Sequence, residues 1–219
     1  MAEVKDRDLV VPGQLIGDGL KHDSSCYTEE GKVYSLVRGL VRLSGNKVEV
    51  IPLSGPYMPK VGDVLVGRIT EDFGGIYLVD IDSAYFCIIR EKVERGQRPT
   101  VYNIGDLVSG KVFQVDEVHE SDLDGIFRLT GGLTIKVDPK RVPRVIGKNR
   151  SMVNMIREKT GCNLVVGQNG LIWVKGEKAD LAIRTIKKVE AEAHTSGLTD
   201  RIMELLNKES ISISKEGVI

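Results

Sequence analysis

The sequence predicts a mainly β protein that ends in an α+β domain, and two observations carry this prediction. Short runs of Val, Ile and Leu recur up to about residue 131, and many of the 24 glycines stand in the turns between them. Beyond residue 132 the apolar residues change from alternate positions to the spacing of helix faces. We therefore expect three domains in the 219 residues, covering 1–58, 59–131 and 132–219.

Composition and charge narrow the class of protein. The chain has 31 basic and 31 acidic residues, which argues against coating nucleic acid through bulk charge but permits a local basic site. No run approaches 18 apolar residues and the N-terminus "MAEVKDRD" is too charged for a signal peptide, so we expect a soluble, cytoplasmic protein with no membrane partner. Cys26, Cys87 and Cys162 lie far apart and the histidines are isolated, so we expect no metal and no cofactor.

The first block, residues 1–58, is predicted to form a β-hairpin domain. "DLVVPGQLIGDG" places apolar residues on both sides of a Pro-Gly turn, and "KVYSLVRGLVRLSGNKVEVIPL" predicts strands broken at Gly39 and at Ser44–Asn46. The segment "GQLIGDG" is not read as a phosphate loop, because neither Lys-Ser/Thr nor a helical pattern follows it. "SGPYMPK", with two prolines, is the expected linker.

The second block, residues 59–131, is predicted to form a closed five-stranded barrel. "GDVLVGRI" and "GDLVSGKV" are similar entries in which Gly-Asp introduces an apolar run that ends at a glycine and a cation. Gly74–Gly75 marks a strand break between them. Closure removes exposed sheet edges, which matters for strands this rich in Val and Ile.

The third block, residues 132–219, combines helices with a hairpin. Apolar residues at helical spacing follow Ser151, the expected N-cap, and Gly161 is the expected end of that helix. The strands "CNLVV" and "LIWVKG" are joined by "GQNG", in which Asn-Gly is a strong hairpin signal. A long helix is predicted from about Glu177, with a break at Gly197 before a last apolar stripe.

Positive charge is concentrated where this third block begins. Eight cations and two acids lie between Lys136 and Lys159, a net charge of +6 in a chain whose total is zero. Part of the excess is offset by the acidic segment "DEVHESDLD". Lys148 and Arg150 stand in the turn before a helix, whose free N–H groups and dipole favour a phosphate. A solvated basic face remains the alternative interpretation.

The segment "VIGKNRSMVNMIREKTGCNLVV" resembles the core of a type I KH domain, whose Ile-Gly-x-x-Gly loop clamps a short single strand by its backbone. Arg150 stands where the family has its second glycine. A side chain restricts that position, so Arg150 either replaces the backbone clamp by a phosphate contact or marks a KH domain kept as scaffold. The resemblance implies an RNA-binding set of Arg144, Gly147, Lys148, Asn149, Arg150 and Ser151.

The barrel block resembles the S1 RNA-binding domain, a five-stranded OB barrel, in "VGDVLVGRITEDFGGIYLVDI" and "IGDLVSGKVFQVD". Phe73 occupies the place of the first surface aromatic of that family, whereas Ile76 stands at the second. The family's surface histidine is missing from "FCIIREKV", which implies a weaker and more electrostatic site. We expect RNA contacts from Arg68, Phe73 and Lys111, each of which is otherwise an ordinary strand residue.

Taken together, the order of the domains and the "GQNG" turn resemble the archaeal exosome RNA-binding cap subunits of the ribosomal-RNA-processing protein four type. This resemblance implies a non-catalytic subunit, in three copies, that sits on a hexameric ring of RNase PH-like subunits. Such a subunit guides 3′ ends of single-stranded RNA into the pore for phosphorolytic degradation. The alternatives are a stand-alone S1/KH regulator of transcription or translation and a hydrolytic nuclease. No nucleophile elbow, P-loop or paired-carboxylate motif is visible in the sequence.

Overall fold

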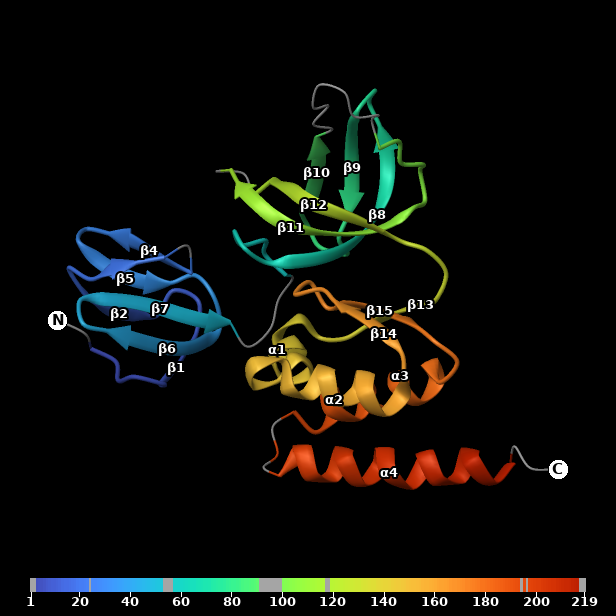
Figure 1. Cartoon of the computed structure of the whole chain (residues 1–219). Coiled ribbons are helices and arrows are strands. Elements are labelled where there is room, and N and C mark those ends of the chain that lie inside the picture. Colours follow the sequence, from blue (N-terminus) through green and yellow to red (C-terminus); the bar gives the residue numbers. More distant parts are fainter. Residues whose placement is uncertain are drawn as a thin grey trace. The chain divides into compact units, whose positions relative to one another are not determined.

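The computed structural model describes residues 3–23, 25–52, 57–90, 100–116, 119–193, 195 and 197–216, with side chains up to residue 207. The chain forms two compact units, residues 1–55 (unit 1) and residues 56–219 (unit 2), each considered by itself (Figure 1). The predicted fold class is confirmed, since the chain is mainly β with a C-terminal α+β region. The expected domain boundaries at residues 58 and 131 stay predictions.

Unit 1 consists of two small sheets around one core. Gly45, the first central residue of the hairpin between Ser44 and Lys47, has φ +60° and confirms the predicted break there. Gly39, the other predicted break, is the first residue of a strand, and a Cβ on it would lie 2.4 Å from the Ile51 carbonyl oxygen, so the close pairing there requires glycine. The strands are β1 (Leu9–Val10), β6 (Gly39–Ser44), β7 (Lys47–Pro52) and β3 (Lys21–His22) in one sheet, and β2 (Leu15–Asp18), β5 (Lys32–Ser35) and β4 (Cys26–Glu29) in the other.

The predicted five-stranded barrel is confirmed in unit 2. It closes in the order β10-β12-β11-β8-β9, and only β10 and β12 run parallel. Gly74 and Gly75 form the turn after the first strand, as predicted, with φ of +75° and +97°. Tyr77 and Tyr102 meet edge to face inside it, with ring centroids 5.2 Å apart. The strands are β8 (Val64–Asp72), β9 (Ile76–Asp80), β10 (Phe86–Arg90), β11 (Leu107–Val115) and β12 (Ser121–Leu129).

The C-terminal α+β region packs helices on a three-stranded sheet of order β13-β15-β14 (Figure 1). The helix predicted after the glycine loop ends at Gly161, as expected, and Gly197 separates the last two helices. The elements are β13 (Leu133–Lys136), η1 (Pro139–Arg141), α1 (Val142–Ile146), η2 (Lys148–Arg150), α2 (Ser151–Thr160), β14 (Asn163–Val166), β15 (Leu171–Lys175), α3 (Ala179–Ala191) and α4 (Leu198–Glu216). In the described part of the chain, no helix is both long enough and apolar enough to cross a membrane.

The Gly167–Gly170 turn between β14 and β15 joins this region to the barrel. Gln168 N–H donates to Val64 O (2.8 Å) and the Gln168 side chain accepts from Val64 N–H (2.9 Å). Asn169, 1% exposed, donates through Nδ2 to Val66 O (2.7 Å) and Ile81 O (2.8 Å), and its Oδ1 accepts from Val66 N–H (3.3 Å). β9 pairs with β8 only from Arg68 onward, so the turn supplies the partner for the free edge of β8 before that residue.

Both glycines of this turn are required by close approach. A Cβ on Gly167 would lie 2.2 Å from Asn169 Oδ1 and 2.8 Å from Val66 N. Gly170 has φ +90°, and a Cβ on it would lie 2.3 Å from Val137 O. The two glycines therefore let the backbones approach closely, and Asn169 supplies the side chain that hydrogen-bonds between them.

Candidate nucleic-acid interface

The glycine loop between α1 and α2 has the left-handed backbone of a tight clamp. Gly147 has φ +75°, and a Cβ on it would lie 2.7 Å from Met152 N, so the position accepts no side chain without rearrangement. Asn149 and Arg150 follow with φ of +52° and +63°. The side chains of Lys148, Asn149 and Arg150 are all exposed. The loop therefore presents two cations on a strongly curved backbone.

Arg150 keeps the conformation that a glycine would adopt at the same place. A left-handed residue with a side chain costs roughly 1–2 kcal/mol, and the surrounding loop holds Arg150 there. Arg150 is also the N-cap of α2, without a side-chain hydrogen bond. The prediction that Ser151 caps this helix is wrong, because Ser151 already has helical φ and ψ of −59° and −44°. Its hydroxyl lies within 3.0 Å of where a Gly147 Cβ would be, against the turn.

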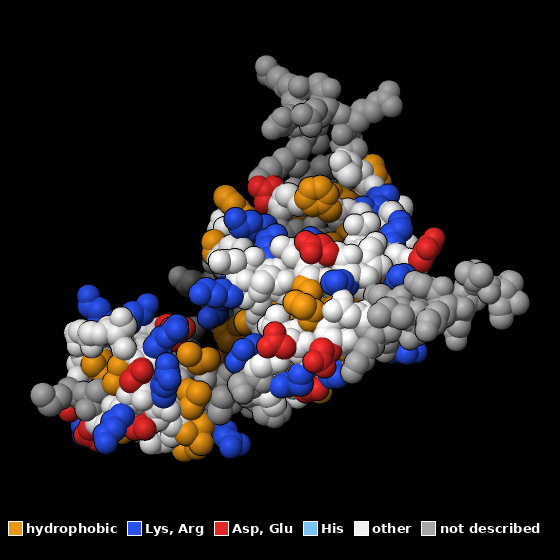
Figure 2. Space-filling view, turned by 60° about the horizontal axis from the view of Figure 1, so that its bottom comes forward, with side chains coloured by type: hydrophobic (Ala, Val, Ile, Leu, Met, Phe, Trp, Pro, Cys, Tyr) orange, Lys and Arg blue, Asp and Glu red, His pale blue; other side chains and the backbone are white. Residues whose placement is uncertain are grey.

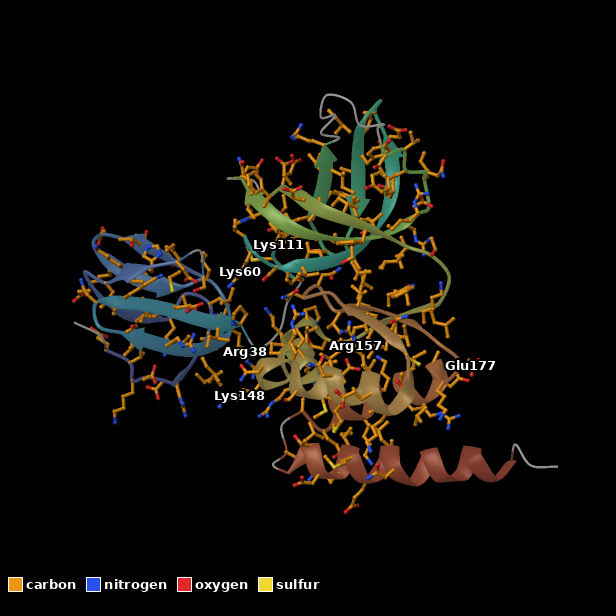
Figure 3. All side chains as sticks on the ribbon, in the orientation of Figure 1. Arg38, Lys60, Lys111, Lys148, Arg157 and Glu177 are labelled. Carbon is orange, nitrogen blue, oxygen red and sulfur yellow. The ribbon has the colours of Figure 1, made fainter. Side chains whose placement is uncertain are left out.

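A groove of about 140 Å³ lies beside this loop. Arg150 and Arg157 lie on its rim, and Arg157 also donates to the Leu164 carbonyl group. Its other lining residues are apolar except Gln168, and they come from the end of α1, from α2, from β14 with the turn after it, and from Val64 of the barrel. Figure 3 shows Lys148 and Arg157 on this helical layer. Apolar walls with cations at the rim suit a base on one side and its phosphate on the other.

The cations of the basic segment around the predicted phosphate site differ in whether they are already paired. Lys136 pairs with Asp82 of the barrel (2.5 Å), and Arg141 contacts both Asp138 (3.7 Å) and the Glu190 carbonyl oxygen (2.8 Å). These cations hold the fold together. A second group makes no ion pair or side-chain hydrogen bond with the described residues, and its members lie in or before the glycine loop in the sequence: Lys140, Arg144, Lys148 and Arg150.

Glu190 anchors the turn that leads into α1. Its carboxylate accepts from Asp138 N–H (2.7 Å) and from Lys187 Nζ (2.9 Å). Burial opposes ionisation, but these two hydrogen bonds and the charges of Lys187 and Arg141 together hold the pKa of Glu190 below its usual value. A charged Glu190 therefore positions the start of the helix before the glycine loop.

The three barrel residues predicted to contact RNA do not lie together. Lys111 pairs with Val64 at the start of β8, whereas Phe73 follows the end of that strand. Nine residues separate the two positions, roughly 30 Å along the strand. Arg68 lies between them, and its guanidinium donates to Gly105 O (2.9 Å), which braces the segment before β11. Phe73 is 64% exposed, in a turn where Asp72 accepts from Gly74 N–H (2.9 Å).

Sequence reasoning missed the other exposed aromatic residues of the barrel. All four phenylalanines of the chain are on its surface, since Phe86, Phe113 and Phe127 are 44%, 61% and 72% exposed. Figure 2 shows apolar side chains interspersed with Lys and Arg on the barrel. The signal was present in strands such as "YFCIIR", where Cys87 and Ile89 alternate with outward positions. Exposed rings beside cations are the features of a surface that stacks single-stranded bases.

Neither Cys26 nor Cys87 is placed to act as a nucleophile or as a metal ligand. Both thiols are buried, and burial raises the pKa of Cys26 and raises that of Cys87 to about 12. A protonated, buried thiol is a poor nucleophile and a poor metal ligand. Within the described ranges, no three His, Cys, Asp or Glu side chains gather in a way that would hold a metal ion.

Comparison with known proteins places this geometry in a family. Residues 7–54 match the family described as the exosome RNA-binding protein RRP4 N-terminal domain, and residues 132–180 match the KH domain. The chain is 40% identical to the exosome complex component Rrp4 of Methanothermus fervidus over 217 residues, which is 94% of this chain and 98% of that protein. The chain belongs to the Rrp4 family of exosome complex components.

Other members of the Rrp4 family match at similar levels. The Pyrococcus horikoshii and Thermococcus kodakarensis proteins are 42% and 40% identical over 99% of this chain, and the match covers 88% and 91% of their own lengths. A crystal structure assigned to an exosome complex RNA-binding protein is 30% identical, with a TM-score of 0.61. It covers 73% of this chain and 99% of that chain. The family resemblance read from the sequence is thus confirmed, as is the KH domain.

Proposed function

We propose that this Rrp4-family chain is the non-catalytic RNA-binding subunit of an exosome in the cytoplasm. It caps a hexameric ring of RNase PH-like subunits, three copies to a ring. In that position it guides the 3′ ends of single-stranded RNA into the pore, where the ring degrades them by phosphorolysis. The names of its relatives support an exosome component, and one similar crystal structure is assigned to an RNA-binding protein.

One observation carries the RNA-binding part of the proposal. The left-handed glycine loop presents Lys148 and Arg150 beside a groove with apolar walls, and Arg150 and Arg157 line that groove. A clamp of this kind binds a short single strand by its backbone and holds a base against the apolar wall. The proposed RNA-binding residues are those predicted from the sequence: Arg68, Phe73, Lys111, Arg144, Gly147, Lys148, Asn149, Arg150 and Ser151.

RNA binding by the purified full-length chain tests this part directly. Four phosphate contacts at about −0.7 per contact imply that affinity for a single strand falls roughly fiftyfold between 50 and 200 mM salt. We expect single strands to bind better than duplexes, because the groove and the exposed rings require unpaired bases. An affinity that does not depend on salt, or equal binding of duplex, would contradict the interface.

Assembly and catalysis are tested on the same protein. We expect the chain to co-elute with RNase PH-like ring subunits in size-exclusion chromatography, and to release no nucleoside diphosphate from RNA and phosphate in their absence. A chain that binds RNA but never associates with ring subunits would instead be a stand-alone regulator. RNA shortening that survives purification and responds to point mutations in this chain would identify a nuclease.

A further inference from the structure

Three lysines converge where the barrel meets the C-terminal region. Val112 N–H donates to Asp63 O (2.8 Å), and Val112 O accepts from Gly62 N–H (2.9 Å). This pairing lays the segment after Lys60 alongside β11, next to Lys111. Both lysines are exposed and lie on the same side of unit 2 as Lys148 in Figure 3.

The third lysine comes from the other side of the junction. The Gly167–Gly170 turn is bonded to Val64, and a Cβ on Gly170 would lie 3.2 Å from the Pro139 ring. Lys140 follows that proline in η1. Burial lowers the pKa of Lys140, and the nearby charge of Lys60 lowers it further. The backbone contacts of the Gly167–Gly170 turn with Val64 and Pro139 therefore bring η1, which carries Lys140, to the end of the barrel where the segment after Lys60 pairs with β11.

The carboxylates next to these lysines are already engaged. Asp63 accepts the hydroxyl of Tyr57, and Asp138 accepts from Lys140 N–H (2.9 Å) and lies 3.7 Å from Arg141. In the described part of the chain, the ammonium groups of Lys60, Lys111 and Lys140 form no ion pair. A group of lysines whose ammonium groups form no ion pair within the described residues favours an anion from outside.

An aromatic ring lies beside the lysines. Phe113 is two residues beyond Lys111 on β11, and it is 61% exposed on the outer side of Val112, whose own side chain is buried in the barrel. Val64, opposite Lys111, is one wall of the groove beside the glycine loop. The lysines therefore stand between an exposed ring on the barrel and the groove of the KH domain.

We propose that Lys60, Lys111 and Lys140 form a phosphate-binding bridge, with Phe113 as a stacking platform, that carries one RNA strand from the barrel to the KH groove. This inference rests on the proposed function and extends it. RNA is favoured over a protein partner because the surface pairs several cations with an exposed aromatic ring, the combination that binds single strands. The two RNA modules would then read one continuous strand.

The test measures binding of two fluorescein-labelled oligoadenylates, of twelve and four nucleotides, to the full-length chain at 50 to 200 mM salt. Replacing Lys60 and Lys140 with Ala should reduce the slope of log affinity against log salt by about 1.4 for the twelve-nucleotide RNA. The loss of affinity over this range would be about sevenfold smaller than for the unmodified chain. The four-nucleotide RNA, the length that a KH loop clamps, should bind as before.

Matched variants distinguish the bridge from simpler explanations. Replacing Lys47 and Arg184 with Ala removes the same charge from exposed cations outside the basic segment, the junction and the groove, and should leave the slope unchanged. Phe113→Leu keeps an apolar side chain but removes the ring, and should weaken the twelve-nucleotide complex about fivefold or more. If the variant with Ala at Lys60 and Lys140 folds poorly, the experiment is repeated with Gln at both positions.

Several results would overturn the proposal. An unchanged slope for the junction variant, when the unmodified chain binds RNA, removes the bridge and leaves the proposed function intact. If the control pair lowers the slope by the same amount, the junction lysines act only through the net charge of the chain. If the junction variant binds RNA normally but no longer assembles with ring subunits, the surface binds a protein instead of RNA. An unmodified chain that binds no RNA defeats the proposed function itself.

Discussion

Asn169 should contribute more to the stability of unit 2 than any other single polar side chain in the Gly167–Gly170 turn. Asn169→Ala removes the side-chain amide that three backbone groups bind, namely Val66 N–H, Val66 O and Ile81 O. Val66 and Ile81 are fully buried, so water does not replace the lost amide. At about 1–3 kcal/mol for each unsatisfied buried group, we expect unfolding to become easier by at least about 3 kcal/mol.

Guanidinium denaturation measures this effect through the single tryptophan, Trp173, which is nearly buried and donates from Nε1 to Gly131 O (2.6 Å). Gln168→Ala is the matched control, because it removes one side-chain hydrogen bond and keeps the backbone bond to Val64. It should cost only about 1 kcal/mol. An Asn169→Ala variant within about 1 kcal/mol of the unmodified chain would refute the view that this side chain replaces a strand partner.

Asn169→Asp sharpens the test because it keeps the shape and replaces the donor with an acceptor. A carboxylate would face two carbonyl oxygens, so the pKa of this Asp in the folded chain would rise above its unfolded value of about 3.9. A raised pKa means that the protonated form is favoured by folding. The deficit of the variant should therefore be smallest below about pH 4 and should grow as the pH rises through the folded pKa. A deficit independent of pH would contradict the donor role.

Three further predictions concern the loop, the turn before it and the barrel. Arg150→Gly should stabilise the chain by about 0.5–1 kcal/mol, because glycine adopts φ +63° without strain, yet it should weaken RNA binding about tenfold if the guanidinium contacts a phosphate. Thermal melts and anisotropy titrations on one preparation separate the two effects, with Lys148→Ala as a variant that removes charge alone. Glu190 has a lowered pKa, so its contribution to the free energy of unfolding should be present above pH 4.5 and lost as the pH falls below it. Glu190→Gln should therefore flatten the fall in stability at acid pH. An unchanged fall would contradict the role of Glu190 in holding the turn before α1. Phe73→Ala should weaken binding of single-stranded RNA by about 1–3 kcal/mol without lowering the melting temperature, and normal binding would remove Phe73 from the interface.

Local signals explain why much of the fold was predictable. Gly161 marks the end of a helix, Gly197 directly precedes α4, and Asn169–Gly170 marks a hairpin, because backbone conformation at a turn depends on the residues in the turn itself. The alternation of apolar residues likewise predicted the barrel strands, since neighbouring side chains in a strand point to opposite faces. The error at Ser151 has the same origin. Ser is one of the preferred N-cap residues, but the left-handed Arg150 already occupies the cap position, so the helix starts at Ser151 itself.

The candidate site was predictable only where one segment holds it. Residues 144–151 are contiguous, so a family motif located the glycine loop, and the charge count located its cations. The barrel residues were chosen from the resemblance to the S1 domain and come from different segments, and the structure separates Lys111 from Phe73 along β8. Register between distant strands decides such distances, and no local pattern in the sequence records it.

The sequence by itself determined the order of the elements, the glycines that shape the loop and the turn, and the family to which the chain belongs. Only the tertiary structure decided which of those elements pack together and which side chains they bury or expose. Asn169 completes the edge of a strand more than 100 residues earlier in the chain, and the same turn packs against Pro139, next to Lys140. The phenylalanines of the barrel face outward while Tyr77 and Tyr102 fill its interior. The physical reason is that burial, pairing and charge proximity depend on which distant segments pack together, whereas turns and helix ends depend on neighbours in the chain.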